Sequence, residues 1–78
     1  MKLTYDPAAN AAYIRFKDER VEVETVEISP SVLIDLAPDG SVYGIELLNA
    51  NEQLAAGDDG KFVVVDPLSG EEHSLKVA

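Results

Sequence analysis

Hydrophobic and polar positions alternate with a period of two along most of this chain, which is the pattern of β-strands that bury one face. In residues 12–17, the apolar side chains of Ala12, Ile14 and Phe16 alternate with larger side chains that have polar ends. A shorter stretch, 2–5, precedes it and ends at Pro7, which lacks a backbone N–H. These stretches predict two strands joined by a tight turn.

The phase of the alternation changes between residues 21 and 28. Val21 and Val23 are apolar at odd positions, whereas the next apolar pair, Val26 and Ile28, lies at even positions. A shift of one residue turns every following side chain to the opposite face of a sheet. We therefore expect a β-bulge or a bend near residues 24–25, or else two separate strands.

Residues 32–48 predict a β-hairpin whose turn is Pro38-Asp39-Gly40. We expect a three-residue loop in which Gly40 adopts the left-handed conformation. The register that follows pairs Leu36 with Val42, Asp35 with Tyr43, and Ile34 with Gly44.

In this register both faces of the hairpin are mostly apolar, and the two acidic residues, Asp35 and Glu46, lie on opposite faces. A hairpin that is apolar on both sides needs cover on both sides. One cover is the core of the protein, and the other is a second copy or a partner; which face is the inner one stays open. The expected interface residues are Leu33, Tyr43, Ile45 and Leu47.

Residues 49–56 favour one or two helical turns, with Asn49 or Asn51 as the N-cap and Gly57 as the stop signal. The fold class that these segments predict is mainly β, an antiparallel β-meander of about five to seven strands with this one short α-helix. The apolar stretch 62–65 predicts a further strand and residues 74–77 a last one, so that residues 61–78 form a C-terminal strand or hairpin that completes the sheet or extends it.

Small size limits the hydrophobic core of this chain, which we expect to form a single domain, 1–78. A chain of 78 residues buries only about 60% of its unfolded surface and usually needs a disulfide, a metal or a partner subunit. The chain has no cysteine and a single histidine, His73, so we expect no disulfide, no metal and no cofactor. Oligomerisation remains, and we expect a homodimer.

Fifteen acidic residues against six basic ones give a net charge of −9. This charge repels nucleic-acid phosphates and anionic membranes, so neither is an expected partner. The same charge would attract a basic protein partner, which would bind at the acidic strand that contains Glu22 and Glu24. The simpler interpretation of this strand is a charged sheet edge that prevents aggregation. Because no stretch has the apolar length of a membrane span or a signal core, we expect a cytoplasmic protein.

Several short motifs follow one another in a characteristic order: Tyr5-Asp6-Pro7, Ala12-Tyr13-Ile14, Glu27 before Ser29-Pro30, Val32 to Asp35, Asp39-Gly40 and Gly44-Ile45-Glu46. Over residues 1–54 this ordered set resembles the family named domain of unknown function 2283. The resemblance implies a small bacterial or archaeal protein built as a β-meander with a short helix, and no biochemical function is assigned to that family.

Four acidic residues combine this resemblance with useful chemistry: Asp6, Glu27, Asp35 and Glu46. Carboxylates of this kind act as acid and base or bind a hard divalent cation. They also serve structure, because Asp6 can cap the turn at Pro7 and the strand acids can accept hydrogen bonds. The structural interpretation is favoured, since paired acids commonly belong to the architecture and no nucleophile motif or phosphate loop accompanies them.

The function that we expect is therefore non-enzymatic: a small acidic protein-interaction module that forms a homodimer. One alternative is a ligand- or divalent-metal-binding domain, or a small enzyme, that uses the four acidic residues. Another is an antitoxin-like partner of a basic protein.

Overall fold

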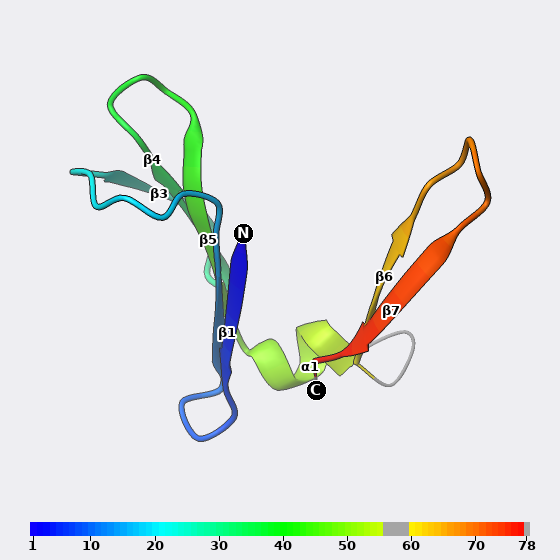
Figure 1. The fold of residues 1–78 in the computed structure, drawn as a ribbon. Coiled ribbons are helices and arrows are strands. Elements are labelled where there is room, and N and C mark those ends of the chain that lie inside the picture. The colour runs from blue at the N-terminus through cyan, green and yellow to red at the C-terminus, as the bar shows by residue number, and fades with distance from the viewer. Residues whose placement is uncertain (56–59, 78) are drawn as a thin grey trace.

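The computed structural model describes residues 1–55 and 60–77 of the chain. In these residues it shows seven strands and one helix (Figure 1). The elements are, in chain order, β1 (Lys2–Asp6), β2 (Ala11–Arg15), β3 (Glu24–Ser29), β4 (Val32–Leu36), β5 (Val42–Leu48), α1 (Ala50–Ala55), β6 (Lys61–Val65) and β7 (Glu72–Lys76). The predicted fold class, mainly β with one short helix, is confirmed. Within the described residues, no helix has the length and apolar character needed to cross a membrane.

Five strands form an antiparallel sheet in the order β1-β2-β5-β4-β3. Strands β3, β4 and β5 form a meander, and the connection from β2 to β3 crosses to the opposite edge of the sheet. Strands β6 and β7 pair in a separate two-stranded sheet, which we call the C-terminal hairpin, residues 61–76. Figure 1 shows this hairpin, in orange and red, projecting away from the five-stranded sheet beyond α1.

Helix α1 is capped by a residue from a distant turn. The backbone oxygen of Asn10 accepts the N–H of Ala50 at 3.1 Å, and its Oδ1 accepts the N–H of Asn51 at 2.7 Å. Asn49 occupies the N-cap position of the backbone, one of the two predicted alternatives, but its side-chain amide donates to Glu52 Oε2 at 2.9 Å. The predicted stop at Gly57 lies outside the described residues.

The turn of the 32–48 hairpin forms as predicted, but the register beyond it does not. Gly40 has a φ of 86°, and Leu36 lies opposite Val42. The next pair is Asp35 with Gly44, so that Tyr43 is an extra residue, a β-bulge, and the predicted pair of Asp35 with Tyr43 is wrong. The bulge places Ile45 and Leu47 on the same face as the apolar residues of β4, so that these side chains are buried against one another. In an unbroken register they would lie on opposite faces.

This register sorts the five-stranded sheet into two faces, which we call the apolar face and the polar face. Two rows of paired residues cross the apolar face: Leu3, Ile14, Ile45, Ile34 and Val26, and beside them Tyr5, Ala12, Leu47 and Val32. Two rows cross the polar face: Lys2, Arg15, Gly44, Asp35 and Thr25, and beside them Thr4, Tyr13, Glu46, Leu33 and Glu27. The expectation that the hairpin is apolar on both faces is therefore wrong.

The change of phase near residue 24 has a simpler cause than a bulge at that point. Strand β3 begins at Glu24, and residues 21–23 lie outside the strands, so the two phases do not belong to one strand. The irregularity of β3 lies further on, between Glu27 and Ser29. The expectation that Glu22 and Glu24 lie in one acidic strand is wrong for the same reason, because Glu22 precedes the strand.

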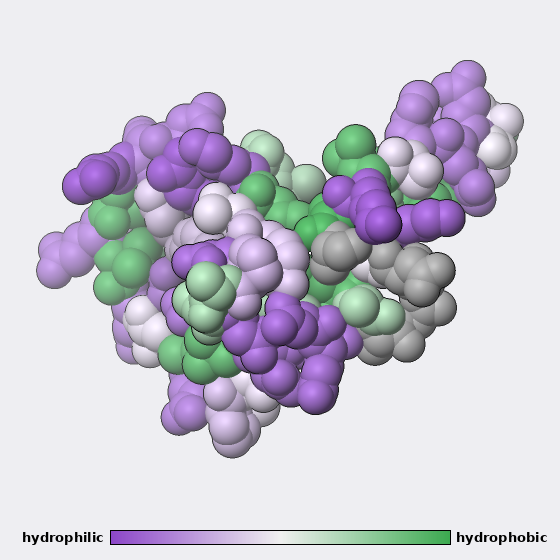
Figure 2. Space-filling model, turned by 90° about the horizontal axis from the view of Figure 1, so that it is seen from below, coloured by the Kyte–Doolittle hydropathy of each residue, from purple (hydrophilic) through white to green (hydrophobic). Residues whose placement is uncertain are grey.

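Among residues 1–55 and 60–77, no second layer closes a core over the five-stranded sheet. Among the described residues the buried hydrophobic side chains are Ala12, Ala37, Tyr43 and Ala50, and no large side chain is fully buried. The accessible surface is 5665 Å², whereas a compact monomer of this mass exposes about 4,600 Å². The radius of gyration, 13.9 Å, likewise exceeds the value of about 11.5 Å for a compact domain. Figure 2 shows hydrophobic residues at the surface beside the notch from which the C-terminal hairpin projects.

Candidate functional site

The polar face carries all four acidic residues that the sequence singled out. Asp35 and Glu46 lie in neighbouring rows of this face, so the expectation that they occupy opposite faces is wrong. The cause is the bulge at Tyr43, which shifts β5 by one residue relative to β4. Glu27 lies opposite Leu33 in the row of Glu46, and Asp6 lies at the end of β1.

Asp35 is the acceptor of a hydrogen-bond network that crosses four strands. Its Oδ2 accepts the hydroxyl of Tyr13 at 2.7 Å, and its Oδ1 accepts the hydroxyl of Thr25 at 2.6 Å. To reach Asp35 from β2, the ring of Tyr13 crosses over Gly44, where an added Cβ would lie 2.1 Å from the Tyr13 oxygen. Burial, followed by the hydrogen bond to Asp35, raises the pKa of Tyr13. This arrangement joins β2, β5, β4 and β3, as the structural interpretation of Asp35 predicts.

Asp6 also has a local structural role. Its Oδ1 accepts the backbone N–H of Ala8 at 3.0 Å and that of Ala9 at 3.2 Å, which closes the turn between β1 and β2. In the part of the chain that the structure describes, no three histidine, cysteine, aspartate or glutamate side chains form a group that could hold a metal ion. The four acidic residues thus share a face, and two of them, Asp6 and Asp35, accept hydrogen bonds within the fold.

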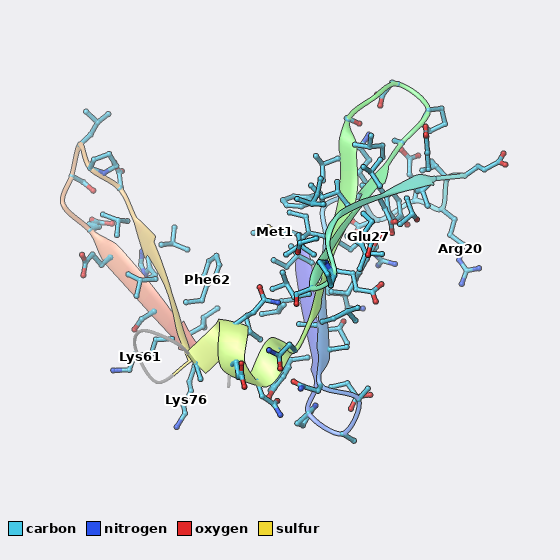
Figure 3. The ribbon with its side chains drawn as sticks, turned by 180° about the vertical axis from the view of Figure 1, so that it is seen from behind. Met1, Arg20, Glu27, Lys61, Phe62 and Lys76 are labelled. Carbon is cyan, nitrogen blue, oxygen red and sulfur yellow. The ribbon has the colours of Figure 1, made fainter. Side chains whose placement is uncertain are left out.

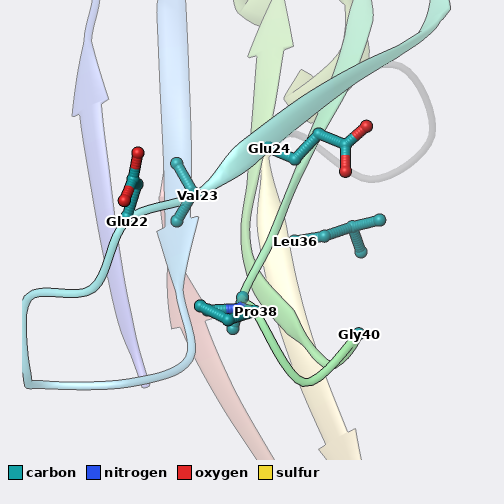
Figure 4. Close-up of a pocket in the computed structure, with 7 residues that line it drawn as sticks. Glu22, Val23, Glu24, Leu36, Pro38 and Gly40 are labelled. Atoms are coloured by element: carbon teal, nitrogen blue, oxygen red, sulfur yellow. The ribbon is translucent and has the colours of Figure 1, made fainter.

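Glu22 and Glu24 border a shallow hollow of about 400 Å³ at one end of the sheet. Figure 4 shows Glu22 on the loop, Glu24 at the start of β3, and Val23 between them, opposite the turn at Pro38 and Gly40. The two carboxylates lie on either side of Val23 rather than side by side. Both residues line the same hollow.

The apolar face extends across the whole sheet, from β1 to β3. Its row from Leu3 to Val26 crosses all five strands, and each residue in it keeps partial exposure to solvent. The four predicted interface residues do not share this face: Ile45 and Leu47 lie on it, Leu33 lies on the polar face, and Tyr43 is buried at the bulge with 9% exposure.

Residues 2–51 of the chain match the model of a family described as Protein of unknown function (DUF2283). The chain belongs to the DUF2283 family. The match runs from β1 to the start of α1 and thus covers both faces of the five-stranded sheet, which confirms the resemblance predicted from the motifs. No curated protein and no solved structure matches the chain.

The C-terminal hairpin lies outside the DUF2283 match and faces the apolar side of the matched sheet across a groove of about 630 Å³. We call this the inter-sheet groove. Its lining residues are Met1, Leu3, Ile14 and Phe16 on the sheet, and Phe62, Leu75, Lys76 and Val77 on and beside the hairpin. Lys76 is the one charged residue among them, so the groove has the chemistry of an apolar contact surface.

Neither the apolar face nor the inter-sheet groove follows from the local sequence pattern alone. The signal for part of the face was present, because Ile14 and Phe16 alternate with polar-ended neighbours. The signal for the hairpin was the unbroken apolar run of β6, Phe62 to Val65. The register that aligns the apolar residues of β2, β5 and β4 on one face depends on the bulge at Tyr43, and no local sequence pattern indicated that bulge.

Proposed function

We propose that this protein is a non-enzymatic association module that forms a homodimer through the apolar face of its five-stranded sheet. The observation that supports the proposal is the row from Leu3 to Val26, which crosses five strands without a charged side chain and remains partly exposed. A sheet with one apolar face needs a second layer to bury that face. A second copy of the same sheet supplies a layer of matching chemistry.

The exposed area is of the size that dimer formation requires. The chain exposes about 1,000 Å² more than a compact monomer of its mass. A stable interface of standard size buries about 800 Å² on each partner. Covering the apolar face with a second copy therefore brings each subunit close to the exposure of an ordinary compact protein.

The charge distribution supports an interface that is hydrophobic rather than electrostatic. Each subunit has a net charge of −9, so two copies repel each other at long range. Salt screens this repulsion and strengthens the hydrophobic contact, so we expect dimer affinity to rise with salt concentration. A complex with a basic protein would weaken under the same change.

Sedimentation equilibrium of the wild type and three variants tests the proposal. Val26→Glu and Leu3→Glu each place a charge on the apolar face at an edge strand, and we expect both to be monomeric. Thr4→Glu is the matched control, because it places the same charge on the polar face next to Leu3, and it should remain dimeric. Circular dichroism spectra serve as the control that each variant is folded.

A monomeric wild type at high protein concentration would overturn the proposal. Dissociation by Thr4→Glu to the same extent as by Leu3→Glu would also overturn it, since the effect would then not depend on the face. Weaker dimerisation at high salt would indicate an interface held by charges instead.

A further inference from the structure

We propose that two homodimers join through strand β1, which pairs edge to edge with β1 of a subunit in the other homodimer. The pairing extends each five-stranded sheet into a ten-stranded one. This inference rests on the proposed function, because it concerns the further assembly of the homodimer. The occupant of the β1 edge is thus residues 2–6 of another copy of this chain.

Strand β1 is an open edge of the five-stranded sheet (Figure 1). It pairs with β2 on one side, and among the described residues no backbone hydrogen bond reaches it from a segment other than β2. An edge strand directs alternate backbone N–H and C=O groups away from the sheet, where another strand can pair with them. Strand β1 therefore offers a row of donors and acceptors to an added strand.

The side chains of β1 are complementary to themselves in one antiparallel register. A two-fold axis through Thr4 places Lys2 opposite Asp6 of the partner subunit, and Asp6 opposite the partner's Lys2. The same axis places Leu3 opposite Tyr5 of the partner subunit and brings the two Thr4 residues together. Opposite charges and threonine pairs are favourable neighbours across antiparallel strands, and the leucine and tyrosine bury apolar surface against each other.

This register also keeps each face of the sheet continuous, because residues directly opposite each other in antiparallel strands lie on the same face. Leu3 and Tyr5 lie on the apolar face and are half-buried. The other three residues of β1 lie on the polar face and are exposed. The apolar face of one subunit thus continues into that of the next and stays available for contact between two layers.

The opposite edge of the sheet, β3, lacks this self-complementarity. A two-fold axis through Glu27 brings two carboxylates together, and an axis through Val26 leaves Glu24 without an opposite charge. The irregularity between Glu27 and Ser29 also disturbs the edge that β3 presents. Of the two edges, β1 is therefore the one that suits a second copy.

One pairing of β1 strands is too small to hold two single subunits together. It involves five residues on each side, whereas a standard interface has about 20–30. When the two-fold axis of the homodimer runs across the strands, both of its β1 edges lie on the same side, and two pairings form at once. The axes then cross at right angles, and the assembly closes as a tetramer.

Sedimentation equilibrium over a range of protein concentrations tests this inference. We expect the wild type to form tetramers from dimers as the concentration rises. Lys2→Glu replaces an attraction to Asp6 of the partner subunit by a repulsion, so tetramer formation should weaken by about tenfold or more while the dimer persists. Lys61→Glu is the matched control, because it changes the net charge equally on the C-terminal hairpin, away from Met1 and β1 (Figure 3). It should form tetramers like the wild type.

Two further variants separate the pairing from a general effect of charge. Thr4→Glu brings two introduced carboxylates together at the axis and should remain a dimer at every concentration. Lys2→Glu combined with Asp6→Lys restores opposite charges across the pairing and should recover tetramer formation. Circular dichroism spectra check that the turn after Asp6 still folds in this double variant.

The outcomes distinguish this inference from the proposed function. A wild type that stays a dimer, or an equal loss of tetramer in Lys2→Glu and Lys61→Glu, would refute the edge pairing and leave the homodimer standing. Growth beyond the tetramer would indicate pairing of β1 with β3 of a neighbour and would also refute it. A monomeric wild type refutes both proposals. If Val26→Glu still forms dimers and adding Thr4→Glu abolishes them, the dimer interface is β1, and the proposed function fails instead.

Discussion

Substitution of Gly44 by alanine is a direct test of the polar-face network. A Cβ at this position would lie 2.1 Å from the Tyr13 oxygen and 2.3 Å from Cζ of the same ring, far inside the normal contact distance of about 3.5 Å. The ring has to move away, and the hydrogen bond of 2.7 Å to Asp35 is then lost. The damage lies on the polar face, so dimerisation through the apolar face should persist.

The magnitude follows from three contributions. Overpacking of this kind costs about 1–3 kcal/mol, and loss of a hydrogen bond to a carboxylate costs about 1.5–3 kcal/mol. Replacing a strand glycine by alanine returns about 0.5–1 kcal/mol of backbone entropy. We therefore expect Gly44→Ala to lower the free energy of unfolding by about 1.5–5.5 kcal/mol.

A double-mutant cycle measured by urea denaturation isolates the contact. In a Tyr13→Thr background the ring is absent, and Gly44→Ala should be neutral or stabilising by about 0.5 kcal/mol. All four proteins are compared at one concentration, because dimerisation contributes to the measured stability. An equal loss in both backgrounds would refute the reasoning, since the cost would then not come from Tyr13.

Three further predictions concern the alkaline limit, the helix cap and the C-terminal hairpin. The pKa of Tyr13 is raised above its ordinary value of 10, so the stability that its neutral hydroxyl contributes is complete below pH 10 and declines as the pH rises further. The urea midpoint of the wild type should therefore fall more steeply at alkaline pH than that of Tyr13→Phe. Asn10→Ala removes the cap of α1 and strains a backbone with a φ of 54°, so thermal unfolding should show a loss of about 1–3 kcal/mol, more than for Asn10→Gly. Leu75→Glu places a charge on the hairpin wall of the inter-sheet groove and should lower the thermal unfolding midpoint, whereas Leu68→Glu, at a turn position that is 98% exposed, should leave it unchanged.

Local signals were sufficient for most of the individual elements. The alternation around Ile14 predicted β2, and the turn at Gly40 formed as expected because a left-handed residue was required there and glycine adopts that conformation without steric cost. Helix α1 also occurs where a short helical stretch was predicted. These features depend on the backbone preferences of adjacent residues, which the sequence contains explicitly.

The length of 78 residues and the absence of cysteine predicted a small core, and among the described residues no large side chain is fully buried. The choice of acidic residues was partly informative: Asp6 and Asp35 have the structural roles that were favoured for them. That Asp35 would accept from both Tyr13 and Thr25 required the tertiary arrangement, because these donors come from strands on either side of the hairpin.

Composition and alternation by themselves determined the strand content and the main turn. Only the tertiary structure decided that Asp35 pairs with Gly44, that Asn10 caps a helix some forty residues away, and that one face of the sheet is apolar from edge to edge. The physical reason is that register follows the total burial available across neighbouring strands. A bulge at one residue, Tyr43, turns every side chain beyond it in β5 to the opposite face of the sheet. The strands against which those side chains are then buried are distant in the sequence.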